Sequence, residues 1–480
     1  MLLAAALGVA GAGQERHPAA VRGQDSAQAL LLLGQTKEKT KDLAGAADAY
    51  ERALQQSPEL AAAHDRLGYV RGQLGQTGAA LEHFARAVAL DPRLFDAQYH
   101  LGATRWWTRD IDGARAPLES AVQLRPDHAE ARYYLGLVLR QQGHIPEAVE
   151  QLRKSVALSP RLAPAHLHLG VTLEQWGDTE GAVAHLKTAV TLDPSSIDAR
   201  NSLGLALMQA GRADAAVETL RQLVRDQPDD VTARVNLGTA LLQKADLAAA
   251  AAIFTEVLAR DPSNALAQYN LGMALKQQDK FEEAERALRR AIDLDPTLPD
   301  APFTLGVVLW QTGRLDEAVA AFRAAIGKKN AYPDAEYMLA TVLKQQGAID
   351  EAITHFHRTI DLQPTMAEAY LSLGQALQQQ GRAPEARVAL EQAQALNQRK
   401  ADAQASTFAV SVGNRKLQTG DLAGAIRQYR EAIKLAADNP QAHYRLAIAL
   451  TRQGSKEEAR RAFDAARALA PYLQPPVGLR

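Results

Sequence analysis

The sequence contains no cysteine among its 480 residues. This absence excludes disulfide bonds, thiolate metal ligands, a thiol nucleophile and an acylated lipoprotein cysteine. Aromatic residues are also scarce, at 5% of the chain against 47% for all hydrophobic residues. The apolar content is therefore mostly alanine and leucine, both of which favour helices. We expect a core of small side chains between closely packed helices.

The chain also lacks an excess of either charge. Its 54 basic and 55 acidic residues give a net charge of −1, and the two signs are interspersed. Such a balance gives no overall attraction to nucleic acid or to an anionic membrane surface, so we expect no nucleic-acid partner. No run reaches the roughly 18 apolar residues that a membrane-spanning helix needs. We therefore expect no membrane span.

The first residues form a short apolar segment with two interpretations. Residues 2–10 are uncharged and apolar, and Ala10-Gly11-Ala12 follows a small-x-small pattern. This resembles the core and cleavage region of a secretory signal, although the usual basic residues before the core are missing. A signal peptide over residues 1–13 predicts an extracytoplasmic protein, periplasmic or secreted. A mis-assigned start or a loose tail predicts a cytoplasmic one. We expect residues 14–26 to be disordered.

A repeat of 34 residues dominates the rest of the sequence. A Leu-Gly pair recurs at this spacing, with small variations, in thirteen units. We number each repeat from 1 to 34 with this leucine at position 7, so that repeat 2 begins at residue 61. Repeats 1–11 occupy residues 27–400, repeats 12 and 13 occupy residues 406–473, and residues 474–480 form a tail. The insertion at residues 401–405 predicts either a longer helix or a hinge. The leucines of the first eight regular pairs are Leu67, Leu101, Leu135, Leu169, Leu203, Leu237, Leu271 and Leu305.

Each conserved position has a direct physical explanation. Positions 3, 7, 10 and 14 follow a spacing of three or four, which places them on one face of a helix. Gly or Ala at position 8 and Ala at position 20 allow two backbones to approach, while a larger residue at position 24 fills the space beside them. Gly near position 15 supplies a turn, and Pro at position 32 ends a second helix. Each unit is thus a helical hairpin that must stack on its neighbours.

This pattern resembles the tetratricopeptide repeat (TPR) family over roughly residues 27–473. Positions 7, 8, 20, 24 and 32 match the family closely, whereas position 4 is polar in most units and position 11 is mostly leucine. The resemblance implies an all-α, right-handed superhelical solenoid of about thirteen helix-turn-helix repeats. It implies a scaffold or adaptor that binds a protein or an extended peptide in a concave groove lined by the first helices. The alternative is a substrate-recruiting or regulatory module of a separately encoded enzyme.

Glutamine at position 13 is the most regular candidate for ligand contact. An amide side chain both donates and accepts hydrogen bonds, so a row of glutamines could hold the backbone of an extended peptide. The competing interpretation is that glutamine is simply a good helix former at an exposed site. We call these residues the glutamine row; its central members are Gln141, Gln175, Gln209, Gln243, Gln277, Gln311 and Gln345.

Two clusters that combine aromatic and basic residues are the other candidates. Aromatic side chains with Arg or Lys are the residue types that anchor protein partners. The competing interpretation is that the aromatics at position 5 only pack between adjacent first helices. The first cluster consists of Tyr99, Trp106, Trp107, Tyr133 and Arg140. The second consists of Tyr269, Lys276, Phe303, Trp310, Tyr337 and Lys344.

Signs of catalysis or of cofactor binding are absent from the sequence. His166 and His168 are two residues apart, which places them on different helix faces and argues against metal chelation. No phosphate-binding loop, catalytic triad or separate catalytic segment is legible. The carboxylate clamp of some TPR proteins requires Lys at position 5, which no unit has; Asn414 and Arg445 are isolated matches. We expect no clamp, no metal, no cofactor and no enzymatic activity.

Self-association is a weaker expectation from the first repeat. Residues 30–33 are four consecutive leucines on the first helix of the array. An exposed apolar run at the end of a solenoid can associate with a second copy. A homo-oligomer is therefore one of the predicted assemblies.

Overall fold

The computed structural model describes residues 21–479, and every regular element in that range is an α-helix. The predicted signal segment, residues 1–13, lies outside the described residues and stays a prediction. Helix α1 (Val21–Lys39) begins within residues 14–26, which we expected to be disordered. That expectation is wrong for residues 21–26, because the first helix extends two turns further toward the N-terminus than the repeat pattern requires.

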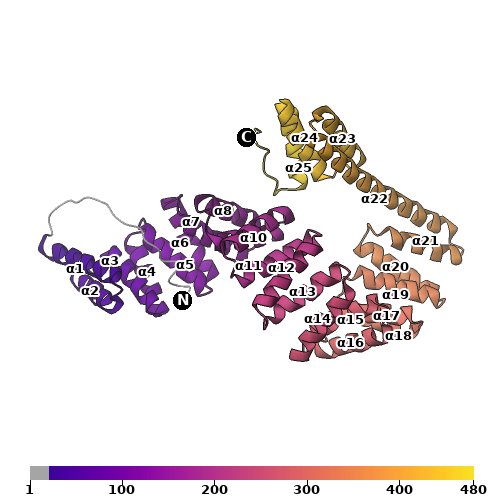
Figure 1. Ribbon diagram of the computed structural model, residues 1–480, viewed down its shortest axis with the longest axis horizontal. Helices are drawn as coiled ribbons and strands as arrows, with labels where there is room; N and C mark the ends of the chain where they lie inside the picture. The colour runs from indigo at the N-terminus through magenta and orange to yellow at the C-terminus, as the bar shows by residue number, and fades with distance from the viewer. Residues whose placement is uncertain (1–20, 480) are drawn as a thin grey trace. The chain divides into compact units, whose positions relative to one another are not determined.

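The chain divides into two compact units, one ending at Gly211 and one beginning at Arg212, and Figure 1 labels their helices. Within each unit, consecutive helices pack against one another. In the first unit they are α1, α2 (Leu43–Gln56), α3 (Ala61–Gln73), α4 (Thr77–Leu90), α5 (Phe95–Trp107), α6 (Ile111–Leu124), α7 (Ala129–Gln141), α8 (Ile145–Leu158), α9 (Ala163–Gln175), α10 (Thr179–Leu192) and α11 (Ile197–Gln209). In the second they are α12 (Ala213–Asp226), α13 (Val231–Gln243), α14 (Leu247–Arg260), α15 (Ala265–Gln277), α16 (Phe281–Leu294), α17 (Asp300–Gln311), α18 (Leu315–Lys328), α19 (Pro333–Gln345), α20 (Ile349–Leu362), α21 (Ala367–Gln379), α22 (Ala383–Gln418), α23 (Leu422–Leu435), α24 (Pro440–Gln453) and α25 (Lys456–Leu469).

The turn inside each hairpin requires a left-handed residue at position 15. Gly177 has φ +86° there, between helices α9 and α10. The next residue, Asp178, caps α10 by accepting a hydrogen bond from the backbone N–H of Gly181 at 2.9 Å. Such a cap satisfies a donor that the first turn of a helix would otherwise leave unpaired. The predicted helix-turn-helix unit is confirmed.

Close approach of the two helices depends on the small residues at positions 8 and 20. A Cβ atom added to Gly238 would lie 2.6 Å from the ring of Phe254, which occupies position 24 of the same repeat. Alanine at position 20 is at most 1% exposed in all thirteen repeats. The predicted packing of small residues beside one larger residue is therefore confirmed, and it explains why so few aromatics suffice for the core.

Polar residues at position 4 link several repeats to the repeat before them. Gln98 donates from its side-chain amide to the carbonyl of Pro92 at 2.9 Å, and Arg132 donates from Nε to that of Pro126 at 2.6 Å. The acceptor in each case is position 32 of the preceding repeat, just beyond the end of its second helix. Carbonyls at a helix end need such partners. In these repeats the contact accounts for a polar residue at position 4, where the family pattern has an aromatic one.

The five-residue insertion lengthens a helix and does not form a hinge. Helix α22 runs without interruption over 36 residues, so it serves both repeat 11 and repeat 12. Phe408, at position 3 of repeat 12, is 66% exposed, whereas alanine at this position is at most 1% exposed in repeats 2–11 and 13. In the other repeats the preceding second helix folds back over position 3. Here the second helix of repeat 11 and the first helix of repeat 12 are one continuous helix, so position 3 stays uncovered.

The residues after α25 return to the last hairpin. Leu473 and Leu479 pack with the core cluster of α23, α24 and α25, and Leu479 is only 8% exposed. The tail therefore helps to cover the end of the array. Within residues 21–479, no helix is both long enough and apolar enough to cross a membrane.

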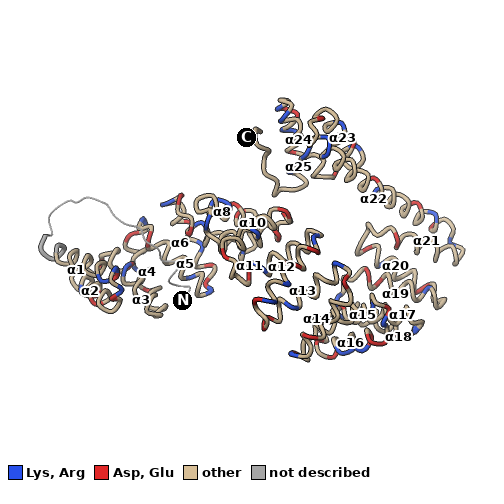
Figure 2. The backbone as a smooth tube through the Cα atoms, in the orientation of Figure 1, with Lys and Arg blue, Asp and Glu red and all other residues tan. Residues whose placement is uncertain are grey.

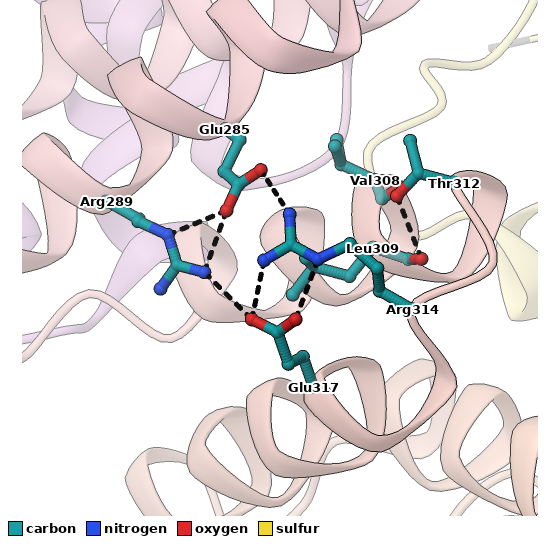
Figure 3. Close-up of polar contacts among 7 residues, drawn as sticks. All are labelled: Glu285, Arg289, Val308, Leu309, Thr312, Arg314 and Glu317. Carbon is teal, nitrogen blue, oxygen red and sulfur yellow. Dashed lines mark hydrogen bonds and ion pairs between the residues drawn. The ribbon is translucent and has the colours of Figure 1, made fainter.

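Charged residues of both signs are spread along the helices of both units (Figure 2). Where second helices of adjacent repeats meet, some form networks. Arg314 donates to Glu285 at 2.7 Å and to Glu317 at 2.6 Å, and Arg289 pairs with the same two carboxylates (Figure 3). Three of these side chains are 40–50% exposed and Glu285 is 19% exposed, so the network stabilises the contact between repeats 8 and 9 only modestly.

Candidate binding surface

The glutamine row ends the first helices and faces solvent. Gln141, Gln175, Gln209 and the other central members are each the last residue of their helix, and all are exposed. These side chains are therefore accessible from solvent.

Positions 12 and 13 of neighbouring repeats are joined by side-chain hydrogen bonds. Gln209 donates to Glu174 at 2.6 Å, and Trp310 donates its indole N–H to the amide oxygen of Gln345 at 2.9 Å. Each bond uses only one end of a glutamine amide, which has two donors and one acceptor oxygen. These two positions form one edge of the first helices, and a hydrogen bond joins them between repeats 5 and 6 in the first unit and between repeats 9 and 10 in the second.

Tyr99 is not part of any accessible surface. It is 3% exposed, stacks on Phe95 with ring centroids 6.0 Å apart, and lies 6.2 Å from the ring of Tyr134. The prediction that Tyr99 contacts a ligand is wrong. An aromatic side chain at position 5 extends between adjacent first helices, and the wide rings around it complete its burial.

The remaining members of the first cluster are half-buried around Tyr134. Trp107 donates its indole N–H to the Tyr134 hydroxyl at 3.2 Å, and Trp106 stands edge-on to Trp107 with centroids 4.9 Å apart. The indole nitrogen of Trp106 is buried without a hydrogen-bond partner. Tyr133 and Arg140 lie on the next first helix, and burial lowers the pKa of the Arg140 guanidinium. The structure thus gathers this cluster, minus Tyr99, on α5 and α7.

The second cluster lies partly in the core and partly on the surface. The ring centroids of Phe303 and Phe322 are 5.8 Å apart. Those of Tyr337 and Phe356 are 5.9 Å apart, so position 5 does pack against position 24. The same side chains are only partly buried. The six members of this cluster, all half-buried, are Tyr269, Lys276, Phe303, Trp310, Tyr337 and Lys344.

The two lysines of this cluster occupy position 12 of the repeats before and after that of Trp310. Lys344 donates to Gln375 of the following repeat at 3.1 Å. Burial lowers the pKa of the Lys276 ammonium, because a charged group loses hydration there. A cationic edge beside exposed aromatic surface is a combination that recognises polypeptide side chains.

A basic cavity between α22 and α24 was missed by the sequence analysis. It has a volume of about 250 Å³, and no acidic residue lines it. Arg445 has a buried Nε without a hydrogen-bond partner, and the Tyr429 hydroxyl donates to Asn414 at 2.9 Å. The sequence contained one indication of this cavity, since Asn414 and Arg445 are isolated matches to the carboxylate clamp. The linear sequence did not show that the two residues line the same cavity. The lining residues are Asn414, Leu417, Gln418, Arg445 and Arg452.

The four leucines of the first helix divide between core and surface. Leu31 is 5% exposed and belongs to the core of the first hairpin, whereas Leu32 is 64% and Leu33 41% exposed. The apolar surface offered to a second copy is thus narrower than the sequence run suggests. Self-association through it stays a prediction.

Comparison with known proteins identifies the repeat. The profile described as tetratricopeptide repeat matches residues 3–61, 104–163, 201–265 and 269–335, which is more than half of the chain. Related profiles of the same repeat match residues 61–94, 174–211, 340–381, 366–400 and 413–454. No curated protein matches the sequence.

Solved structures of similar proteins include one of MamA, which is 28% identical over 34% of this chain and 96% of its own, with a TM-score of 0.33. The Cut9–Hcn1 tetramer structure is 15% identical over 88% of this chain and 96% of its own, with a TM-score of 0.37. PilF of Pseudomonas aeruginosa is 21% identical over 44% of this chain and 97% of its own, with a TM-score of 0.39. On the family profile and the stacked helical hairpins together, the chain belongs to the tetratricopeptide repeat family.

Proposed function

We propose that this protein is an interaction scaffold that binds a polypeptide along the edge formed by positions 12 and 13 of its first helices. The observation that carries the proposal is the Trp310–Gln345 pair, which sets a partly exposed indole beside an exposed amide across two repeats. A tryptophan in this setting offers a large apolar contact area, and the amide next to it can bond a peptide backbone.

The surroundings of Trp310 favour an extended ligand. Half-buried aromatic side chains recur at position 5 of repeats 8, 9 and 10, and glutamine recurs at position 13 of the same repeats. An extended segment crossing consecutive repeats would therefore meet the same chemistry at each step. Affinity from repeated backbone contacts does not require a fixed ligand sequence.

The basic cavity suggests a preference for an acidic group on the partner. Arg445 and Arg452 line it without an acidic residue, and the Asn414 amide is held there by Tyr429. A carboxylate is the anionic group that polypeptides supply most often, and it suits the planar donors of arginine. We place an acidic side chain or a chain terminus of the partner at this cavity.

A display selection of random extended peptides on the full chain tests the proposal. Trp310→Ala should weaken binding of the selected peptides by at least tenfold, or roughly 1.4 kcal/mol, without a large change in melting temperature. Phe408→Ala is the matched control, because Phe408 is equally aromatic and 66% exposed but lies on α22 away from this edge. Equal binding by the Trp310→Ala protein would reject this edge as the binding surface.

The cavity is tested with the same peptides. Arg445→Gln and Arg452→Gln should reduce binding of peptides that carry Asp or Glu and leave neutral peptides unaffected. A loss that is the same for acidic and neutral peptides would contradict a carboxylate in the cavity.

A further inference from the structure

Two pairs of histidines occupy the same place in two repeats of the first unit. His64 on α3 faces His83 on α4, and His166 on α9 faces His185 on α10. In both pairs the two Nδ1 atoms are 3.0 Å apart. The ring centroids are 5.3 Å apart in the first pair and 5.2 Å in the second. The pairs join positions 4 and 23, and they are three repeats apart in sequence.

The partner of the opposite ring nitrogen defines the tautomer of each position 4 histidine. Nε2 of His64 lies 3.1 Å from the carbonyl of Pro58, and Nε2 of His166 lies 3.2 Å from that of Pro160. A carbonyl only accepts hydrogen bonds, so Nε2 carries the proton and Nδ1 carries a lone pair. This carbonyl contact is also the outer contact that metal-binding histidines usually make, since it fixes the ring and its tautomer.

The distance between the paired nitrogens suits one metal ion. Two ligand nitrogens at about 2.1 Å from an ion and at right angles to each other are about 3.0 Å apart. A tetrahedral ion would hold them about 3.4 Å apart. We propose that each His–His pair is a binding site for a divalent transition-metal ion that accepts ligands at right angles, such as Cu²⁺ or Ni²⁺. Without metal, His83 and His185 donate Nδ1–H to their partners; to bind, each moves its proton to Nε2 and stays neutral.

Each site has two protein ligands, the paired imidazole nitrogens. No group of three or more His, Cys, Asp or Glu residues that could hold a metal occurs among residues 21–479, so water must complete each coordination shell.

The charged groups near each pair nearly cancel. Arg86 and Arg71 act on the first pair against Glu82 and Glu51, and Arg71 is itself paired with Glu51. Arg153 acts on the second pair and lies 3.6 Å from Asp178. Neither site therefore gains a strong electrostatic attraction for a cation, and binding depends on the coordinate bonds of the two imidazoles.

The residue at position 4 of another repeat shows which side chain can replace a histidine ligand without disturbing the hairpin. Gln98 occupies position 4 of repeat 3 and donates to the carbonyl of Pro92, just as the histidines do. His64→Gln and His166→Gln should keep the contact with the proline carbonyl and lose the metal ligand. Each substitution is thus expected to fold normally.

Calorimetric titration of the full chain with Cu²⁺ at pH 7 tests the proposal. The double variant His64→Gln/His166→Gln should bind two equivalents fewer than the natural sequence, and each single variant one fewer. The electron paramagnetic resonance spectrum of those two equivalents should show coupling to two imidazole nitrogens. An unchanged stoichiometry in the double variant, with an unchanged circular dichroism melt, would overturn the proposal.

His355→Gln is the matched control. His355 also occupies position 23, but its Nδ1 faces the carboxylate of Glu336 at 2.5 Å and not a second imidazole. This variant should keep both equivalents of Cu²⁺. A loss of one equivalent here would show that copper does not distinguish the His–His pairs from this contact, and would also overturn the assignment.

Discussion

Trp310 and Gln345 come from different repeats, yet the indole N–H of the first lies 2.9 Å from the amide oxygen of the second. The 35-residue separation is one repeat plus one residue, so position 12 of one repeat meets position 13 of the next. Gln209 and Glu174 show the same relationship in the other unit. The surface that we propose for ligand binding is therefore made between repeats and not within one.

The glutamines at position 13 of three consecutive repeats can be replaced together. The triple variant Gln141→Ala, Gln175→Ala and Gln209→Ala should leave the melting temperature nearly unchanged, because alanine is at least as good a helix former as glutamine. Binding of selected peptides should weaken several-fold if the amides hold the peptide backbone, as equilibrium binding measurements would reveal. Unchanged affinity would leave helix propensity as the whole explanation of the row.

Substitution of Gly238 should destabilise the second unit. The added Cβ of Gly238→Ala would lie 2.6 Å from the Phe254 ring, and the overpacking should cost about 1–3 kcal/mol in the free energy of unfolding. Gly78→Ala is the control, since no atom lies within 4 Å of its added Cβ. That change should stabilise the protein by about 0.4–1 kcal/mol. Urea denaturation followed by circular dichroism would separate the two outcomes.

A buried hydrogen-bonded pair, His100 and Asp65, joins repeats 2 and 3. Truncation of the aspartate should lower the free energy of unfolding strongly. His100 and Asp65 are 6% and 2% exposed, and Nδ1 of the histidine lies 2.8 Å from the carboxylate. Asp65→Ala should cost about 3 kcal/mol, because it leaves the imidazole without its partner among aromatic rings. Asp65→Asn retains an acceptor oxygen and should cost less. Equal losses for the two variants in thermal denaturation would argue that packing, and not the polar contact, is what matters.

Acid should weaken the first unit through two half-buried histidines, His168 and His185. Burial lowers the pKa of His168 and of His185 to about 4, whereas the unfolded residues titrate near 6.5. Between these values the unfolded chain binds more protons, so the free energy of unfolding falls as the pH falls from about 6.5 to 4 and does not change above that range. At pH 5 each histidine should contribute a loss of about 1–2 kcal/mol after allowance for solvent screening.

Chemical denaturation at pH 7 and at pH 5 would measure this loss. The double variant His168→Gln/His185→Gln should lose less stability than the natural sequence between the two pH values. The comparison removes the contribution of the carboxylates, which is common to both proteins. The same pH dependence in both proteins would contradict a role for these histidines.

The repeat length and its small residues were enough to predict the helices. Positions 8, 20 and 24 constrain one another locally, since glycine or alanine is needed wherever two backbones approach within one hairpin. The pairing of Gly238 with Phe254 and the burial of every position 20 alanine follow from contacts that span fewer than 34 residues. Such contacts require the same residue types at the same positions of every repeat. The family assignment depends on this recurrence in the sequence.

Only the tertiary structure shows which residues meet between repeats. The same holds for positions whose residue type differs from one repeat to the next. Exposure of Trp310 and burial of Tyr99 depend on the width of the side chains in the neighbouring helices, although the sequence places both residues on first helices. The choice between a hinge and the continuous helix α22 depended on whether residues 401–405 kept helical hydrogen bonds. The histidine pairs are 19 residues apart on opposite helices of a hairpin, a spacing that gains chemical meaning only once the hairpin has closed.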